Sequence, residues 1–261
     1  MTVRHRSEPR ALVLWRGLVG AAAVAALYQV VALAGIVDRR LLPAVPAIGR
    51  EVARLAVDPD FLGAVGNTMT AVALGLLISC VAGIGGGLGL GASSLATRMT
   101  RAPIDVLRSL PSVALIPLLL MTLGDGVRMK TVVVVVVAVW PVLLNTTYGV
   151  RSVDGVAVDA ARSFGLSRLR VWAGVVVPSA VPAALTGFRI ALPMALTVAI
   201  SSEMAAGTPS GIGGFILRTS YRDFDAAPVF AAVVLAGLIG WALNAAAAGL
   251  GNRLVPWEGR R

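Results

Sequence analysis

The chain reads V-D-A-A-R-S-F-G-L-S-R-L-R-V-W-A-G-V-V-V-P from Val158 to Pro178, a short charged stretch between two long apolar runs. Upstream of Gly165, apolar residues recur at helical spacing and predict an amphipathic helix with one apolar stripe. The stripe consists of Val153, Val156, Ala157, Ala160, Ala161 and Phe164. We expect Gly165 to end this helix, and a second short helix with Leu169, Trp172 and Val176 on one face to run up to Pro178. Such a stripe needs a covering surface, either the protein's own spans or a partner.

The flanking runs place this segment beside a membrane. The chain is 57% hydrophobic and 14% charged, whereas roughly a quarter of the residues in soluble domains are charged. Its 261 residues can supply six spans of roughly 20 residues each. The net charge of +10 comes from basic residues in short loops rather than on one long basic face, which argues against nucleic-acid binding.

Hydropathy predicts an all-α integral membrane protein with about six transmembrane helices. The first run, at 24 residues, exceeds a signal-peptide core of about 7–15 residues and is expected to be retained as a span. A short helix is expected at about Ile48–Ala56. The spans are expected at about Ala11–Ala34, Phe61–Gly91, Ile104–Leu123, Lys130–Val150, Ser179–Met204 and Ala227–Asn252.

Basic residues are distributed unequally between the loops on the two sides of the membrane. With the N-terminus inside, the inner segments hold 14 Lys and Arg residues and the outer loops hold eight. Because cytoplasmic loops carry the excess of these residues, both termini and the segment around Gly165 are predicted to be cytoplasmic. The chain is therefore predicted to be a multi-pass membrane protein.

Small and kinking residues recur within the spans. Gly83, Gly87 and Gly91 are spaced four apart on one helical face, where they favour close helix packing in lipid. Prolines within or near the middle of spans are expected to kink helices, and this either opens a path or only shapes the packing. These prolines are Pro111, Pro117, Pro141 and Pro193.

Polar side chains are sparse within the spans. Because a polar group that faces lipid is costly, those present are candidates for a translocation path, with helix-to-helix hydrogen bonds as the alternative. The candidates are Asn145, Thr146, Thr197, Ser201, Ser202 and Glu203. Glu203 lies near the outer end of its predicted span.

Enzyme chemistry is missing from the sequence. One cysteine, Cys80, and one histidine, His5, cannot build a metal site, so no metal is expected. The chain contains no G-x-x-x-x-G-K-[ST] loop and no G-x-S-x-G elbow, so we expect it to be no enzyme. An ion-gradient-driven secondary transporter stays open as an alternative, although midplane ionisable relays and inverted repeats are not evident.

The segment around Gly165 resembles the E-A-A-x-x-x-G-x(9)-I-x-L-P signature of permease subunits of ABC importers. Asp159, Ala160 and Ala161 align with E-A-A, and Gly165 aligns with the glycine. Asp159 is one methylene shorter than the usual Glu. Val175, Val177 and Pro178 align with I-x-L-P.

Other stretches resemble the nitrate, sulfonate and taurine branch of the same family, in the family's order. They are N-T-M-T-A-V-A-L-G (Asn67–Gly75), R-S-L-P-S-V-A-L-I-P-L (Arg108–Leu118), P-V-L-L-N-T (Pro141–Thr146), S-E-M (Ser202–Met204) and G-I-G (Gly211–Gly213). The resemblance implies a type I ABC importer permease (MetI-like) fold with cytoplasmic coupling helices at about residues 153–176.

The resemblance also implies a location, the cell membrane of a prokaryote, and a set of partners. They are a second permease subunit, identical or related, two cytoplasmic ATPase subunits, and an extracytoplasmic solute-binding protein. ATP and Mg would be bound by the ATPase subunits, and no cofactor is expected in this chain. The residues implied for ATPase coupling are Asp159, Ala160, Ala161, Phe164, Gly165, Leu169 and Pro178.

Three regions are therefore expected. Residues 1–60 hold the cytoplasmic N-terminal tail, the first span and an extracytoplasmic loop. Residues 61–250 form the permease transmembrane domain, and residues 251–261 form a cytoplasmic C-terminal tail. The expected function is to translocate a small solute that the binding protein delivers; the residues do not identify that solute.

Overall fold

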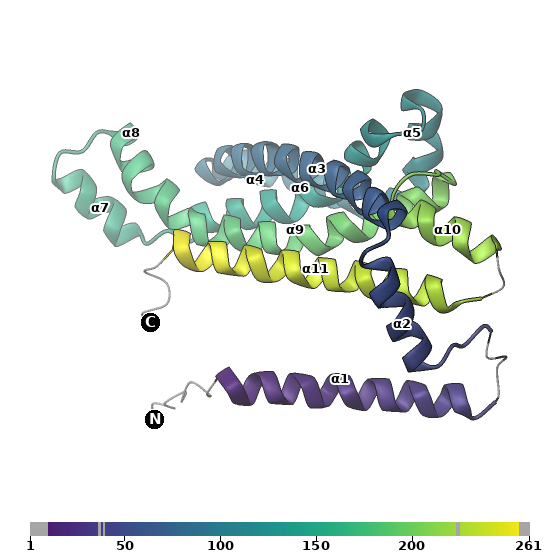
Figure 1. The fold of residues 1–261 in the computed structure, drawn as a ribbon. Helices are drawn as coiled ribbons and strands as arrows, with labels where there is room; N and C mark the ends of the chain where they lie inside the picture. Colours follow the sequence, from purple (N-terminus) through teal and green to yellow (C-terminus); the bar gives the residue numbers. More distant parts are fainter. Residues whose placement is uncertain (1–9, 36–37, 39, 223–224, 256–261) are drawn as a thin grey trace.

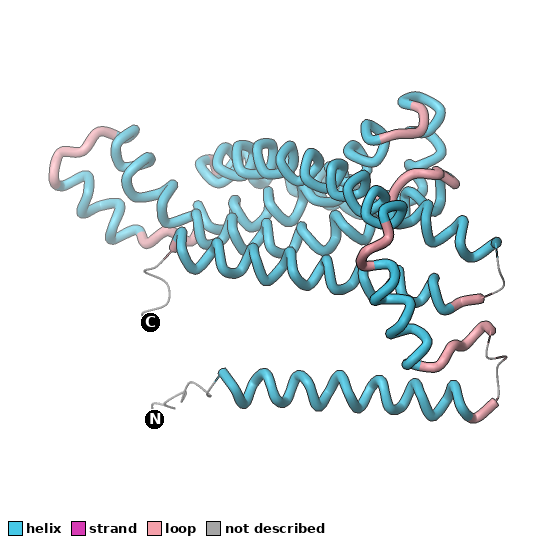
Figure 2. Tube along the Cα trace, in the orientation of Figure 1, coloured by secondary structure: helices cyan, strands magenta, loops and turns pink. Residues whose placement is uncertain are grey.

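The computed structural model describes residues 10–35, 38, 40–222 and 225–255. Helices and the turns between them make up this part of the chain, and it contains no strand (Figure 2). The elements are α1 (Arg10–Leu33), α2 (Val45–Leu55), α3 (Pro59–Ala92), α4 (Ser94–Ser109), η1 (Ser112–Leu115), α5 (Ile116–Leu123), α6 (Val127–Arg151), α7 (Gly155–Ser163), α8 (Arg168–Val171), the π-helical η2 (Trp172–Val176), α9 (Val177–Ala206), α10 (Ile212–Arg222) and α11 (Ala227–Leu254). The predicted all-α membrane fold is confirmed.

Five stretches of helix are long and apolar enough to cross a membrane. They lie in α1, α3, α6, α11 and the continuous segment from Arg168 to Ala206 that joins α8, η2 and α9. A sixth crossing exists only if the bent pair formed by α4 and the η1–α5 segment is counted as one span. The bend lies at Leu110 and Pro111, and Pro111 is one of the prolines expected to kink a span.

The span expected at about Ile104–Leu123 is sharply bent, at one of the prolines expected to kink it. The helix breaks at Leu110, and the two halves meet at an angle of 76°. Leu110 has the extended backbone that a residue before proline favours, and Pro111 is the N-cap of η1. Pro117 lies in the first turn of α5, where a backbone N–H would have no partner within the helix, so proline is tolerated there. Helix α10 was not anticipated from the sequence either.

Helix α6 lies between α3 and α9 and shares the main hydrophobic core with them. Val133, Val134, Ala138 and Val142 of α6 are fully buried or nearly so. A smaller cluster joins α2, α3, α10 and α11 at one end of the bundle. There Phe61 and Phe215 meet edge to face, with ring centroids 5.1 Å apart.

Close approach of α3 to α6 depends on glycines. A Cβ added at Gly83 would lie 2.9 Å from Val142 Cβ, and one at Gly87 would lie 2.6 Å from Thr146 Cβ. At Gly91 the distance to Val150 Cβ would be 2.5 Å. Because real Cβ atoms do not approach so closely, these contacts support the packing interpretation of the three glycines.

Hydrogen bonds near its C-terminal end attach helix α1 to the segment that leads into α2. The hydroxyl of Tyr28 donates to the carbonyl of Pro43 at 2.9 Å, and Gln29 Oε1 accepts from the backbone N–H of Val45 at 2.7 Å. Only 6% of the apolar stretch Trp15–Leu33 is buried inside the structure, and Figure 1 shows α1 apart from the main bundle. Its apolar surface therefore needs lipid or another subunit to cover it.

The two ends of the bundle differ. Helices α7 and α8 project from one end, where the first turn of α1 and the last turn of α11 also lie (Figure 1). Helices α2, α5 and α10 gather at the opposite end. We call these the α7 end and the α10 end. Helix α11 continues to Leu254, into the region that the sequence assigned to a C-terminal tail.

Candidate functional site

The turn at Gly165 is built by local sequence. Asp154 caps α7, since its Oδ1 accepts from the backbone N–H of Val156 at 2.9 Å. At the other end, the N–H of Gly165 donates to Arg162 O and the N–H of Leu166 donates to Ala161 O, the two bonds of a Schellman motif. Gly165 has φ = 76°, in the left-handed region that favours glycine. The expected helix stop is therefore present at this residue.

Most apolar residues around this turn are exposed among the residues that the structure describes. Phe164 is 87% exposed, Leu169 77% and Val156 75%. Ala161 is buried, while Ala157 and Ala160 are exposed. Of the two covering surfaces considered from sequence, the protein's own spans cover very little of the stripe. This leaves an apolar surface, formed by Val156, Phe164 and Leu169, that we call the α7 surface.

The remaining predicted coupling residues frame this surface. Asp159 is exposed and lies 3.7 Å from Arg162 as an i,i+3 pair on α7. An exposed pair of this kind adds little stability, so the carboxylate of Asp159 is free to interact elsewhere. Pro178 lies in the first turn of α9. Between α8 and α9, residues Trp172–Val176 form a π-helical turn, a feature that often marks functional positions in helices.

A buried polar network occupies the α10 end. Lys130 of α6 and Glu203 of α9 have fully buried side chains, and Lys130 Nζ lies 3.0 Å from Glu203 Oε1. Lys130 Nζ also donates to Asn67 Oδ1 at 2.6 Å and lies 3.3 Å from Ser210 Oγ. Thr68 Oγ1 donates to Glu203 at 2.8 Å. Each charged group thus has both an ionic partner and hydrogen bonds, which is what burial of charge requires.

The same carboxylate is held by the start of α10. Glu203 Oε2 accepts from the backbone N–H of Gly213 at 2.8 Å, at a helix N-terminus where negative charge is favoured. Thr68 Oγ1 in turn accepts from the N–H of Ile212 at 2.9 Å. A Cβ at Gly211 would overlap the carboxylate of Glu203, and Gly211 has φ = 94°. The G-I-G stretch therefore forms a cradle for Glu203.

The structure separates the six predicted path residues into two groups. Thr197 and Ser201 line two neighbouring cavities of about 440 and 410 Å³. Ser202 and Glu203 are fully buried, and Ser202 Oγ donates to Ala199 O at 2.7 Å. For these two residues, the conformation favours the alternative of structural hydrogen bonds.

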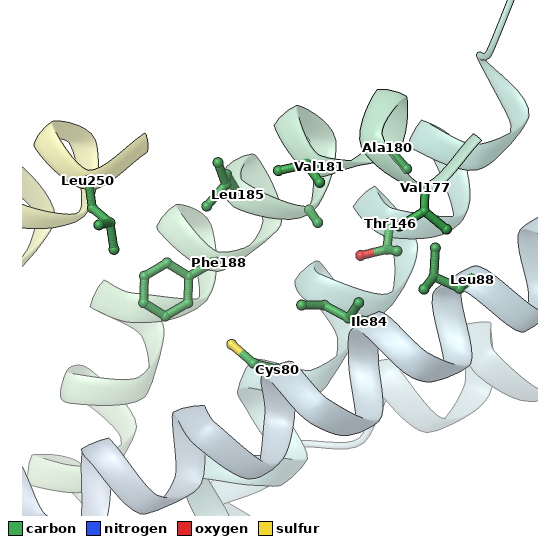
Figure 3. Close-up of a pocket in the computed structure, with 11 residues that line it drawn as sticks. Cys80, Ile84, Leu88, Thr146, Val177, Ala180, Val181, Leu185, Phe188 and Leu250 are labelled. Carbon is green, nitrogen blue, oxygen red and sulfur yellow. The ribbon is translucent and has the colours of Figure 1, made fainter. Parts of the chain in front are cut away.

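Asn145 and Thr146 also bond within their own helix. Asn145 Nδ2 donates to Pro141 O at 2.8 Å, and Thr146 Oγ1 donates to Val142 O at 2.7 Å. Thr146 reaches the edge of an apolar pocket of about 260 Å³ between α3, α6, α9 and α11. Figure 3 shows Cys80 and Phe188 pointing into the same space. No charged side chain lines this pocket, so it is unsuited to a hydrated ion.

Sequence reasoning missed Lys130 as a functional or structural group. It was placed at the start of a span, and its connection to Glu203 was not recognised because 73 residues separate the two. A usable signal existed: one lysine and one glutamate each border an apolar run, and such charges pair when they are buried. Only the fold shows that these two runs, in α6 and α9, are neighbours.

Comparisons with known proteins identify the family. The model of the family "binding-protein-dependent transport system inner membrane component" matches residues 75–258. The chain is 30% identical over 214 residues to the nitrate import permease protein NrtB of Leptolyngbya laminosa, covering 78% of this chain and 76% of the relative. It is 30% identical over 192 residues to the taurine transport system permease protein TauC of Escherichia coli, covering 74% and 69%.

Solved structures share the fold. An inward-facing structure of the MetNI methionine ABC transporter matches with a TM-score of 0.58 at 17% identity, covering 76% of this chain and 98% of the matched chain. A bacterial alginate ABC transporter matches with a TM-score of 0.57 at 14% identity, covering 94% of each chain. At these identities the likeness concerns the fold alone, and it agrees with the MetI-like permease fold inferred from the sequence. Together with the family match, it shows that this chain belongs to the inner membrane components of binding-protein-dependent transport systems, as a multi-pass permease subunit of an ABC importer.

Proposed function

We propose that the α7 surface docks a cytoplasmic ATPase subunit and transmits its movement to the membrane bundle. The observation that carries this proposal is the exposure of Phe164 and Leu169 on a segment built with a cap at Asp154 and a stop at Gly165. An ordered apolar surface outside the spans needs a protein partner to cover it. This chain contains no G-x-x-x-x-G-K-[ST] loop. In this proposal, the partner ATPase subunit binds ATP and Mg.

The route of transmission follows from chain continuity. The segment from Arg168 to Ala206 runs without interruption from α8 through the π-helical turn into α9. Helix α9 packs against α6 and α3 in the main core. A displacement of the α7 surface therefore acts directly on the central helices. Closure of two ATPase subunits would move this surface and switch the bundle between inward-open and outward-open packings as rigid bodies.

The proposed orientation places the α7 end in the cytoplasm. The excess of Lys and Arg in alternate loops supports it. Both chain ends would then be cytoplasmic, and the α10 end would face the extracytoplasmic binding protein. Two permease subunits, identical or related, would form the membrane part, with the sparsely covered helix α1 available for contact with lipid or the second subunit.

The proposed substrate is a small solute carrying an anionic group. The relatives are named for nitrate, taurine, aliphatic sulfonates and bicarbonate, which all carry such a group. The secondary-transporter alternative has no support from the comparisons, since the family depends on binding proteins. Of the six candidates from the sequence, Thr197 and Ser201, which line two neighbouring cavities, are our preferred path residues.

The test changes the α7 surface without changing the core. Phe164→Ser should abolish ATPase co-purification and lower uptake at least tenfold, because the side chain would lie in the interface while making little contact within the subunit. Tyr221→Ser is the matched control: Tyr221 is 79% exposed but lies on α10, at the opposite end. The measurements are the amount of ATPase retained by the purified permease and uptake into cells.

Two results would contradict the proposal. One is normal ATPase retention by Phe164→Ser. The other is equal loss in Phe164→Ser and Tyr221→Ser, which would indicate a general defect in assembly rather than a docking site at the α7 end. Membrane insertion, followed by the amount of full-length chain in the membrane fraction, should be the same in both variants.

A further inference from the structure

Four arginines surround one cavity at the α7 end. The cavity, of about 580 Å³, is lined by Arg98, Arg101 and Arg108 of α4 and by Arg151, the last residue of α6. The three α4 arginines share one face because their spacings of three and seven residues are helical. Leu90 of α3 closes another side. Two helices, α4 and α6, thus bring four guanidinium groups to one space that α3 also lines.

The positive charge of this cavity is poorly balanced within the chain. Asp105 is the one carboxylate in its lining, and it pairs with Arg108 at 3.0 Å. Among the residues that the structure describes, Arg98, Arg101 and Arg151 have no carboxylate within ion-pair distance. Several unpaired cations around one cavity raise the local positive potential and attract anions.

The elements that carry the arginines are held in place. Ser93 caps α4, with its Oγ accepting from the N–H of Ala96 at 3.2 Å. Thr97 Oγ1 donates to Leu90 O at 2.7 Å, which ties the first turn of α4 to the last turn of α3. Since guanidinium groups recognise oxyanions through paired N–H donors, arginines on fixed elements are suited to this task.

The cavity continues into others along the bundle. A second cavity of about 610 Å³ shares Asp105, Arg108 and Leu144 with it. A third, of about 410 Å³, shares Ser112, Val137 and Met194 with the second and is also lined by Thr197 and Ser201. The arginine cluster therefore lies at one end of a row of cavities that reaches the preferred path residues.

We propose that Arg98, Arg101, Arg108 and Arg151 form a binding site for an oxyanion. The chemistry of the ligand is a compact group such as sulfonate, sulfate, carboxylate or phosphate. It has two possible sources: a soluble anion within the row of cavities, or the phosphate of an anionic lipid at the membrane surface. The site concerns binding by this chain and does not require that the α7 surface docks an ATPase.

The test neutralises two arginines that have no carboxylate partner. The full chain with Arg98→Gln and Arg101→Gln is compared with wild type and with a control carrying Arg50→Gln and Arg218→Gln. The control residues are exposed, lie on α2 and α10 at the opposite end, and remove the same charge. If the double variant fails to fold, Arg151→Gln alone provides the comparison, with helicity followed by circular dichroism.

Two arms distinguish the sources. In detergent, thermal unfolding is followed against sodium sulfate, with sodium chloride at matched ionic strength as reference. Because sulfate stabilises proteins generally by exclusion, the readout is the difference between variant and wild type. In nanodiscs, the retention of phosphatidylglycerol is compared with that of phosphatidylcholine by native mass spectrometry.

The expected result is selective loss in the cavity variant. Either the sulfate concentration for half-maximal stabilisation rises at least tenfold, which identifies a soluble anion, or phosphatidylglycerol retention falls to the level of phosphatidylcholine, which identifies a lipid headgroup. The control should behave as wild type in both arms. Equal behaviour of the cavity variant and wild type in both arms, or equal loss in the control, would overturn the proposal.

Discussion

The two ends of the bundle differ in whether the subunit itself satisfies the side chains that need a partner. At the α10 end, Lys130 and Glu203 are fully buried, and both of these charged groups find their partners inside the subunit. At the α7 end, Phe164 and Leu169 are apolar and exposed, and the described part of the chain leaves them uncovered. The first end is complete in one subunit, while the second is complete only in a larger assembly.

This difference indicates separate tasks for the two ends. A closed polar network fixes the relative positions of α3, α6, α9 and the start of α10, because breaking it would leave a buried charge unpaired. An exposed apolar surface on a capped, well-defined turn adds little to the stability of the subunit, but it is suited to docking a partner protein. Substitutions within the buried network should therefore change stability, and those on the α7 surface should change assembly.

The largest expected effect comes from breaking the buried ion pair. Glu203→Gln or Lys130→Met should each lower the free energy of unfolding by about 3–5 kcal/mol, because each leaves one buried charge unpaired. The double variant should recover a large part of this loss, since neither charge remains. Chemical unfolding of the purified chain in detergent measures all three. Single variants as stable as wild type would contradict the network's structural role.

A smaller effect distinguishes two glycines with positive φ. Gly211→Ala should destabilise by about 2–4 kcal/mol, because backbone strain adds to overlap with the carboxylate of Glu203. Gly165→Ala should cost about 1 kcal/mol, since only the strain applies and open space surrounds the position. Thermal unfolding of both variants checks this order. Equal losses at the two positions would remove the contrast between a packed and an open end.

The sequence predicted most of the helices because long apolar runs bounded by charged loops leave few alternatives. Helices α3, α6, α9 and α11 lie within a few residues of their expected bounds. The stop at Gly165 was also predictable, since glycine there supplies the left-handed backbone of the turn. The glycines at positions 83, 87 and 91 could be assigned to packing because their spacing places them on one face.

The features that the sequence did not predict depend on contacts between distant parts of the chain. Pro111 predicted a kink, but its size of 76° could not be predicted, because hydropathy continues unchanged through Leu110 and Pro111. The partner of Glu203 could not be derived, since it lies on another helix far along the chain. Placing Glu203 among path residues followed from its polarity alone, and polarity does not distinguish a water-facing group from a buried ion pair.

The most direct test of the central claim is site-specific cross-linking at the α7 surface. Cys80, the one cysteine of the chain, is replaced by serine, and Phe164→Cys or Tyr221→Cys is then introduced. In the assembled complex, a thiol-reactive cross-linker should join position 164, and not position 221, to the ATPase subunit. Cross-linking of the ATPase through position 221 with none through position 164 would contradict the account.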